Sequence, residues 1–330
     1  MNLKSKFESG LSVFMVRMFN QRIPIAVRIE LSNRCPNRCF YCNIWSIKQK
    51  EMTTKQVFKL LDELKQMGTK RISFSGGEPL LRDDIGEIID YCDSLGMVPE
   101  MNSRGFLIDE KIDKIKKLKL LKISIDGPKE VHDYLSGRKG SFEEAVHALE
   151  LATKNGIKTI ITVTITKQNI QYFDFLIELA KKYNSMIAFQ PLKLLSRGVS
   201  NMDNIWPEKE EYTKAIAKLI SYKLHNNGIM RNSLIGLKHI YHWPVYQKLK
   251  CSAGKLFCII DTDGTVYPCD RIQYKEELPN CIELGFKQAW QRLKNVKLRC
   301  SGCGFCGSLE LNFLYNFKFR ILDTIFRLVD

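Results

Sequence analysis

A short loop carries the residues of this chain that are best suited to bind a metal. Cys35, Cys39 and Cys42 follow a C-x3-C-x2-C spacing, and no fourth cysteine or histidine lies nearby in the sequence. A structural zinc site needs four protein ligands, and an iron–sulfur cubane is usually held by four thiolates. Three thiolates therefore predict a cubane that keeps one iron open for a ligand that is not protein. The alternative is a zinc knuckle that takes its fourth ligand from elsewhere in the chain.

A second group of cysteines lies toward the C-terminal end. Its members are Cys251, Cys258, Cys269, Cys300, Cys303 and Cys306. Two-residue gaps place thiols for chelation, and a disulfide framework rarely needs two triplets of this kind. We therefore expect metal-binding cysteines in a reducing cytoplasm. Cys92, in an expected helix, and Cys281, in an expected loop, have no such neighbours and are interpreted as ordinary buried cysteines.

Composition limits the class of protein. The 330 residues suit one large domain, or a large domain with a small appendage, and a hydrophobic content of 45% is enough for a sizeable core. No run of 18 apolar residues predicts a membrane span. The apolar run from Leu11 to Val16 is interrupted by Arg17 and has no cleavage site, so we expect no signal peptide. The net charge of +15 favours anionic partners without choosing among them.

Residues 25–190 alternate between apolar runs and helical patterns, which predicts strand–helix units and a parallel sheet. The expected strands are Ile25–Leu31, Arg71–Phe74, Val98–Met101, Leu121–Ile125, Thr159–Val163 and Met186–Phe189. Six units are too few for a closed eight-stranded barrel. The fold class we expect is therefore α/β, a partial (β/α)6 TIM-like barrel with a small C-terminal cysteine-rich β-hairpin and helix appendage, in preference to a doubly wound sheet.

Unusual polar clusters fall at the carboxyl ends of successive strands. The cysteine loop follows the first expected strand, and Gly76-Gly77-Glu78-Pro79 follows the second. Asn102 follows the third strand, and Ser124-Ile125-Asp126-Gly127 closes the fourth. Barrel-like α/β folds place their active sites at this edge. Four clusters in succession therefore predict the site.

These motifs, in this order and spacing, resemble the radical S-adenosylmethionine (SAM) superfamily over roughly residues 25–190. The resemblance implies a [4Fe–4S] cluster with an open iron that chelates the amine and carboxylate of S-adenosyl-L-methionine. A low-potential cluster can pass one electron to the sulfonium and release a 5′-deoxyadenosyl radical.

The resemblance also assigns roles to residues. Cys35, Cys39 and Cys42 would ligate the cluster, Tyr41 would lie against adenine, and Gly76, Gly77, Glu78 and Pro79 would meet the ammonium. Asn102 and Ser103 would form a polar turn against the cofactor, Ser124 and Asp126 would face the ribose, and Arg138 would pair with the methionine carboxylate. Arg138 could instead be a solvated loop residue.

The second cysteine group resembles the auxiliary iron–sulfur appendage of the SPASM and twitch type. No cysteine follows Cys306, which indicates a shortened version with one auxiliary [4Fe–4S] cluster on Cys251, Cys269, Cys300 and Cys303. Cys306 and Cys258 are alternate ligands, and a structural zinc is the competing interpretation. The cluster could bind substrate, accept an electron or hold the appendage together; four ligands argue against the first role.

The expected organisation has four parts. An N-terminal helical extension covers 1–24, the radical SAM domain 25–235, the iron–sulfur appendage 236–309 and an amphipathic helix 310–330. Basic and aromatic residues in both end segments indicate either helices packed on the barrel or a peripheral membrane contact. We expect cytoplasmic protein that is free or bound at a membrane surface.

The leading functional hypothesis is hydrogen abstraction from an unactivated carbon of a small molecule or lipid, assisted by the auxiliary cluster. A low-potential donor of the flavodoxin or ferredoxin type would supply electrons. Residues 193–204, including Arg197, would line the substrate pocket. The alternatives are a peptide-modifying maturase, disfavoured because only about 24 residues precede the first strand and leave no peptide-binding module, and a non-catalytic electron-transfer protein. We see no dedicated nucleic-acid module.

Overall fold

The computed structural model describes residues 3–192, 205–225, 228–269, 277–297, 300 and 302–317, with side chains from residue 10 onward. Its eight strands are β1 Ala26–Ser32, β2 Arg71–Gly76, β3 Val98–Ser103, β4 Leu120–Ser124, β5 Thr159–Ile165, β6 Met186–Pro191, β7 Phe257–Ile260 and β8 Val266–Tyr267. Its described helices are α1 Leu3–Met18, α2 Thr54–Gln66, α3 Ile85–Ser94, α4 Ile108–Lys111, α5 Lys129–Ser136, α6 Ser141–Lys154, α7 Phe173–Lys182, α8 Lys209–His225, α9 Leu234–Ile240, α10 Cys281–Leu284, α11 Phe286–Arg292 and α12 Cys306–Tyr315.

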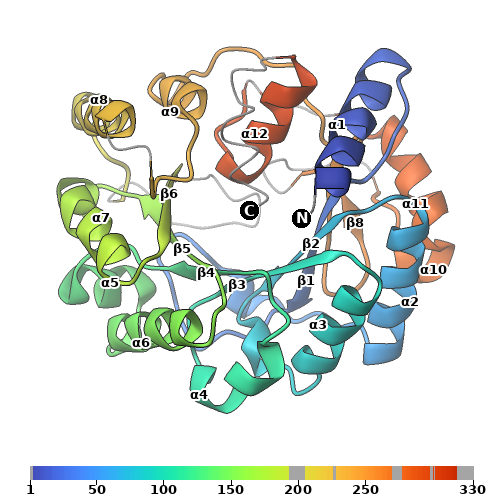
Figure 1. Cartoon of the computed structure of the whole chain (residues 1–330), viewed down its shortest axis with the longest axis horizontal. Coiled ribbons are helices and arrows are strands. Elements are labelled where there is room, and N and C mark those ends of the chain that lie inside the picture. Colours follow the sequence, from blue (N-terminus) through green and yellow to red (C-terminus); the bar gives the residue numbers. More distant parts are fainter. Residues whose placement is uncertain are drawn as a thin grey trace.

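One curved sheet organises the molecule, with strand order β6-β5-β4-β3-β2-β1-β7-β8. The six expected strands are parallel neighbours in sequence order, and the sheet remains open. Helices α2, α3, α6 and α7 lie along its outer face, and α9, α12 and α1 lie on the side where the sheet does not close (Figure 1). The expected partial barrel is confirmed.

The β-hairpin expected in the C-terminal appendage is present around Gly264, but its strands extend the barrel sheet. Strand β7 pairs in parallel with β1, with Ala26 opposite Phe257, and β8 pairs antiparallel with β7. Gly264 has φ +90°, in the left-handed region that glycine readily adopts at a turn. The cysteine-rich C-terminal segment is thereby joined to the barrel by backbone hydrogen bonds.

Local sequence explains the helix that follows the cysteine loop. Thr53 caps α2: its hydroxyl accepts from the Gln56 amide, while the Gln56 side chain accepts from the Thr53 amide. This reciprocal capping box satisfies two amides that would otherwise lack partners. Val57, Leu60, Leu61 and Leu64 then fall on one face and are buried against the sheet.

The ends of the chain agree only in part with the sequence. The N-terminal helix is present as α1, but the C-terminal helix expected from residue 310 begins at Cys306 and is described as far as Tyr315. Residues 318–330 and the expected pocket segment 193–204 lie outside the described residues. None of the helices in the described ranges is long and apolar enough to cross a membrane.

Strand alternation divides apolar from charged side chains. On β2, Ile72 and Phe74 are fully buried in the core between sheet and helices, so Arg71 and Ser73 lie on the opposite face, inside the barrel. There the Glu100 carboxylate pairs with Arg71 Nε at 3.0 Å and Lys122 Nζ at 2.6 Å. The Ser73 hydroxyl accepts from Lys122 and from Asn102, which connects this ion pair to the strand ends.

Glu100 should give the fold an acid-sensitive contribution. Burial alone would raise the pKa of its carboxyl, but Arg71 and Lys122 outweigh it and lower the pKa to about 2. The ionised form therefore stabilises the fold fully above the unfolded pKa of about 4.3, and this contribution is lost as pH falls toward 2. Glu100→Gln should cost about 3–5 kcal/mol at pH 7, because two cations lose their buried partner.

Urea unfolding measures the free energy of unfolding of wild type and Glu100→Gln, from pH 7 down to the lowest pH at which both proteins fold. The difference between wild type and Glu100→Gln should shrink as pH falls. Glu143→Gln removes a carboxylate from an exposed pair with Lys129 and should change little. A Glu100 difference that is independent of pH would contradict the electrostatic explanation.

Candidate active site at the carboxyl edge of the barrel

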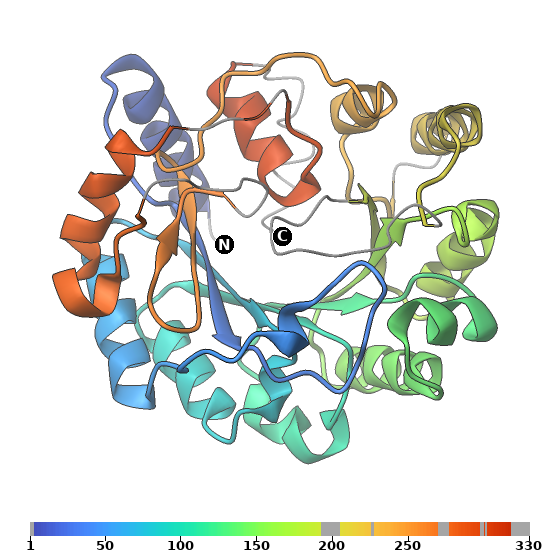
Figure 2. The same cartoon turned by 180° about the vertical axis from the view of Figure 1, so that it is seen from behind.

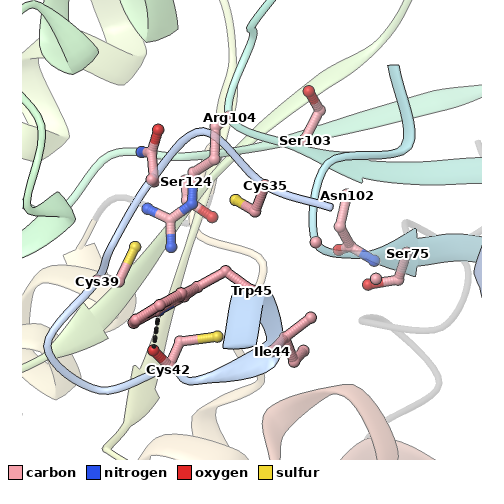
Figure 3. A pocket seen from close by; sticks show the side chains of 13 residues that line it. Cys35, Cys39, Cys42, Ile44, Trp45, Ser75, Asn102, Ser103, Arg104 and Ser124 are labelled. Carbon is pink, nitrogen blue, oxygen red and sulfur yellow. Dashed lines mark hydrogen bonds between the residues drawn. The ribbon is translucent and has the colours of Figure 1, made fainter. Parts of the chain in front are cut away.

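The three cysteines of the first loop open onto one pocket at the carboxyl ends of β2, β3 and β4 (Figure 3). The pocket is lined by Cys35, Asn37, Cys39, Cys42, Ile44, Trp45, Ser75, Gly76, Gly77, Asn102, Ser103, Arg104 and Ser124. The structure therefore brings together eight of the site residues expected from sequence. In a cubane each thiolate bonds a different iron, so thiols spread around a shared pocket are a donor set that fits a cluster.

No three histidine, cysteine or carboxylate side chains among the described residues are grouped to hold a single metal ion.

The Gly-Gly-Glu turn holds the start of the cysteine loop by direct backbone contact. The amides of Gly77 and Glu78 donate to the carbonyl oxygens of Ser32 and Arg34, at 2.6 and 2.8 Å. A Cβ atom on Gly76 would lie 2.2 Å from Ser32 O, and one on Gly77 would lie 2.2 Å from Arg34 O. Glycine is required here because the two backbones touch.

Arg82 ties the two ends of the loop together. Its guanidinium donates to Leu31 O at 3.1 Å and to Met52 O at 2.9 Å, and it is oriented by Asp84. The hairpin adds a further anchor, since the Met52 amide donates to Thr262 O at 2.8 Å. The loop from 33 to 52 is thus closed by a buried arginine and braced by the β7–β8 connection.

Arg138 serves the loop from the opposite side. Its Nε donates to Asn37 Oδ1 at 2.8 Å and its Nη1 to Glu144 at 2.8 Å, while Asn37 Nδ2 donates to Ser141 Oγ at 2.9 Å. Arg138 is not among the pocket-lining residues. In this structure its guanidinium binds Asn37 and Glu144, and the pairing of Arg138 with a methionine carboxylate stays a prediction.

Tyr41 and Asp126 meet behind the pocket. The Tyr41 hydroxyl donates to Asp126 Oδ2, and the other carboxylate oxygen accepts from the Thr164 amide at 2.7 Å. Both side chains are buried. Both residues were expected to contact the cofactor, and in the structure their side chains form hydrogen bonds within the chain. These bonds tie the cysteine loop to β4 and β5.

His132 continues this network toward the loop. Its Nδ1 accepts from the Asp126 amide at 3.0 Å. Burial lowers the pKa of His132 to about 4, so the ring is neutral near pH 7 and carries its proton on Nε2. That N–H faces Ser141 Oγ at 3.2 Å. A continuous chain of hydrogen bonds therefore runs between Asn37 and Tyr41, both on the loop.

Arg104 is a pocket residue that the sequence analysis missed. Its Nη2 donates to Tyr41 Oη at 3.2 Å, and its Nη1 lies 3.7 Å from Asp126 Oδ2. Burial opposes its charge, but the nearby Cys39, Tyr41 and Asp126 hold its pKa well above the usual value. A usable signal was its position directly after Asn102-Ser103 at a strand end.

The thiols and Glu78 have perturbed acidities. Burial raises the pKa of Cys35, Cys39 and Cys42, and the Arg104 charge acts in the opposite direction on each. Burial also raises the pKa of Glu78 to about 7, although its carboxylate accepts from Ser103 Oγ at 2.9 Å and the Arg104 amide at 2.7 Å. Glu78 and Pro79 are both buried beside the pocket and joined to the end of β3.

Most of the second cysteine group gathers beside β7. Cys251 packs against the cluster that contains Cys269, and thiolate charge on Cys303 and Cys300 contributes to raising its pKa, behind the larger effect of burial. Cys258 is buried on β7 next to Cys281, the first residue of α10. Cys306 lies at the end of β6, with its Sγ 3.1 Å from Phe189 O.

A partial barrel with a three-thiol pocket at its carboxyl edge fits an enzyme that uses an iron–sulfur cluster and a small cofactor. Residues 29–180 match the sequence model of the Radical SAM superfamily. This match indicates a radical SAM enzyme, a class that uses a [4Fe–4S] cluster and S-adenosylmethionine.

Two kinds of relative extend this match. The mycofactocin maturase MftC of Mycolicibacterium smegmatis is 28% identical over 325 residues, which cover 93% of this chain and 79% of MftC. Among solved structures, Streptococcus suis SuiB bound to precursor peptide SuiA has a TM-score of 0.68 at 16% identity, over 85% of this chain and 67% of SuiB. The structure of native anSMEcpe with bound AdoMet and Cp18Cys peptide has a TM-score of 0.66 at 19% identity, over 92% of this chain and 99% of anSMEcpe. These two structures share the fold.

The glycine contact predicts a specific mutational effect. Gly77→Ala forces a methyl group into the Arg34 carbonyl and should destabilise the protein by about 1–3 kcal/mol. Because the displaced backbone carries Cys35, iron per chain after anaerobic reconstitution should fall as well. Thermal unfolding and iron analysis measure the two effects.

Gly10→Ala is the matched control, since nothing lies within 4 Å of a Cβ at this helical position. It should leave iron content unchanged and stability equal or slightly higher. Normal iron loading by Gly77→Ala would show that the close contact does not position the cysteines.

Proposed function

We propose that this chain is a peptide-modifying radical SAM enzyme. The observation that carries the proposal is the match to a named maturase over 93% of the chain, well beyond the barrel itself. Two solved structures with the same fold have peptides bound. These relatives favour the peptide-maturase alternative over the small-molecule or lipid substrate that the sequence favoured.

The pocket residues support an assignment of roles. Cys35, Cys39 and Cys42 would hold the cluster, leaving one iron for the methionine part of the cofactor. Ser75, Asn102 and Ser124 offer hydroxyl and amide groups across the pocket, and Arg104 offers a cation to a carboxylate. When bound, the cluster and cofactor supply a radical that removes a hydrogen atom from substrate. The pocket side chains would orient the cofactor.

The peptide proposal is tested with short peptides encoded beside the gene. We expect a SAM- and reductant-dependent change in peptide mass, accompanied by 5′-deoxyadenosine. The variant with Cys35, Cys39 and Cys42 changed to Ala should produce neither. Conversion of a free amino acid or a lipid extract, with no peptide altered, would contradict the proposal.

The second cysteine group supports an auxiliary [4Fe–4S] cluster on Cys251, Cys269, Cys300 and Cys303. Cys306 stays an alternate ligand. Cys258 is less favoured because its neighbour is Cys281 rather than this group.

Metal analysis tests this assignment without any substrate. The Cys35/Cys39/Cys42→Ala variant should retain ~4 iron per chain, as expected for one cubane. Adding Cys251→Ala and Cys303→Ala should remove that iron, whereas Cys92→Ala, which changes a buried cysteine of α3, should not. One zinc in place of the iron would support the structural alternative instead.

A further inference from the structure

The outer surface of the cysteine loop has an unusual composition. Between residues 33 and 50 the exposed positions are Arg34, Arg38, Phe40, Trp45, Ser46, Lys48 and Lys50. All except Ser46 are basic or aromatic. The loop crosses the near face of the molecule in Figure 2, over the edge of the sheet.

The aromatic members are large and open to solvent. Phe40 and Trp45 are 44% and 42% exposed, and Tyr134 on α5 is 54% exposed. The rings of Phe40 and Tyr134 lie 4.8 Å apart, so Tyr134 extends the same surface. Single exposed apolar residues are common, but here a pair of exposed rings, Phe40 and Tyr134, lies on the same loop and its neighbouring helix as the exposed, pocket-lining Trp45, which favours an interaction surface. We call Tyr134 together with the basic and aromatic loop residues the loop patch.

The patch is directly connected to the cysteines beneath it. Trp45 Nε1 donates to Cys42 O at 3.1 Å, and Trp45 also lines the thiol pocket (Figure 3). Arg38 Nη1 donates to Cys35 O at 2.7 Å, and its guanidinium lies 4.4 Å from the centre of the Trp45 ring. A protein seated on the loop patch would therefore lie one side chain away from the cluster ligands.

Charge indicates the chemistry of that partner. Arg34, Arg38, Lys48 and Lys50 project from the loop, and the acid that follows, Glu51, is already engaged by Arg34 and Arg82. On α5 the exposed charges are Lys129, which pairs with Glu143, and Glu130; Lys139 follows. The surface is predominantly positive, which steers acidic proteins toward it.

We propose that the loop patch is the docking surface for an acidic one-electron donor protein of the flavodoxin or ferredoxin type. The reduced donor loses one electron and the [4Fe–4S] cluster gains it; no bond forms or breaks. The aromatic side chains would provide apolar contact and the basic ones would set orientation. Trp45, which donates to Cys42 O and lines the thiol pocket, would lie between the donor and the cluster. This inference depends on the enzyme class and is independent of the peptide substrate.

The test compares two reductants on the reconstituted full chain. A purified reduced flavodoxin must dock, whereas dithionite is a small molecule and bypasses the patch. Lys48→Glu with Lys50→Glu should raise the flavodoxin concentration for half-maximal rate of cluster reduction about tenfold and flatten its salt dependence. Phe40→Ala with Tyr134→Ala should weaken docking with the salt dependence retained. Both variants should be reduced by dithionite at the wild-type rate.

Lys114→Glu with Lys117→Glu is the matched control. It makes the same change in net charge at exposed positions that precede β4, at the opposite end of the sheet. The rate at which flavodoxin reduces the cluster should therefore be unchanged. Cluster reduction is followed by absorbance without any substrate, so failure of the peptide proposal would not affect it.

Three results would overturn the docking proposal. An unchanged flavodoxin dependence in both patch variants would place the donor elsewhere. An equal loss in the rate of cluster reduction by dithionite would mean that the patch residues only preserve the structure around the cluster. A weaker response to a peptide substrate, with flavodoxin reduction unaltered, would make the patch a substrate surface.

Discussion

The active-site loop depends on one buried guanidinium. Arg82 donates to the carbonyl oxygens of Leu31, at the end of β1, and Met52, at the end of the loop. It thereby converts twenty residues without regular strands into a closed ring fixed to the sheet. Other contacts set the shape of that ring: the glycine turn at its start, Asn37 and Ser141 at its far side, and Thr262 near its end. Each thiol position depends on the closure, since an open loop would pay a large conformational entropy to hold three cysteines together.

Buried charged side chains inside the barrel are also paired with one another. Glu100 pairs with Arg71 and Lys122 inside the barrel, and Arg104 pairs with Asp126 and Tyr41 beside the pocket. Ion groups of this kind gain little over apolar packing, but their partners fix a unique geometry. Here the geometry fixed is the set of strand ends that surrounds the thiols.

Local patterns were sufficient for much of this structure. Apolar periodicity located the six strands, and the Thr53 cap and the Gly264 turn follow from residues a few positions apart. Local patterns could not predict contacts between segments that are distant in the sequence. No residue near Gly77 in the sequence indicates that a side chain there would collide with the Arg34 backbone. No residue near Arg138 indicates that Asn37 accepts a hydrogen bond from its Nε. Arginines such as Arg82 and Arg104 have no local signature, because their roles come from where a long side chain ends.

The position of β1 in the sheet has a consequence for synthesis of the chain. Strand β1 is bordered on one side by β2 and on the other by β7, which begins at Phe257. On the ribosome, the cysteine loop emerges early, yet the strand that flanks it and the Thr262 brace are translated long afterwards. A nascent chain therefore exposes Cys35, Cys39 and Cys42 on an incomplete sheet edge for most of translation. The loop that carries these thiols therefore gains its last supporting contacts only when β7 and Thr262 have been made.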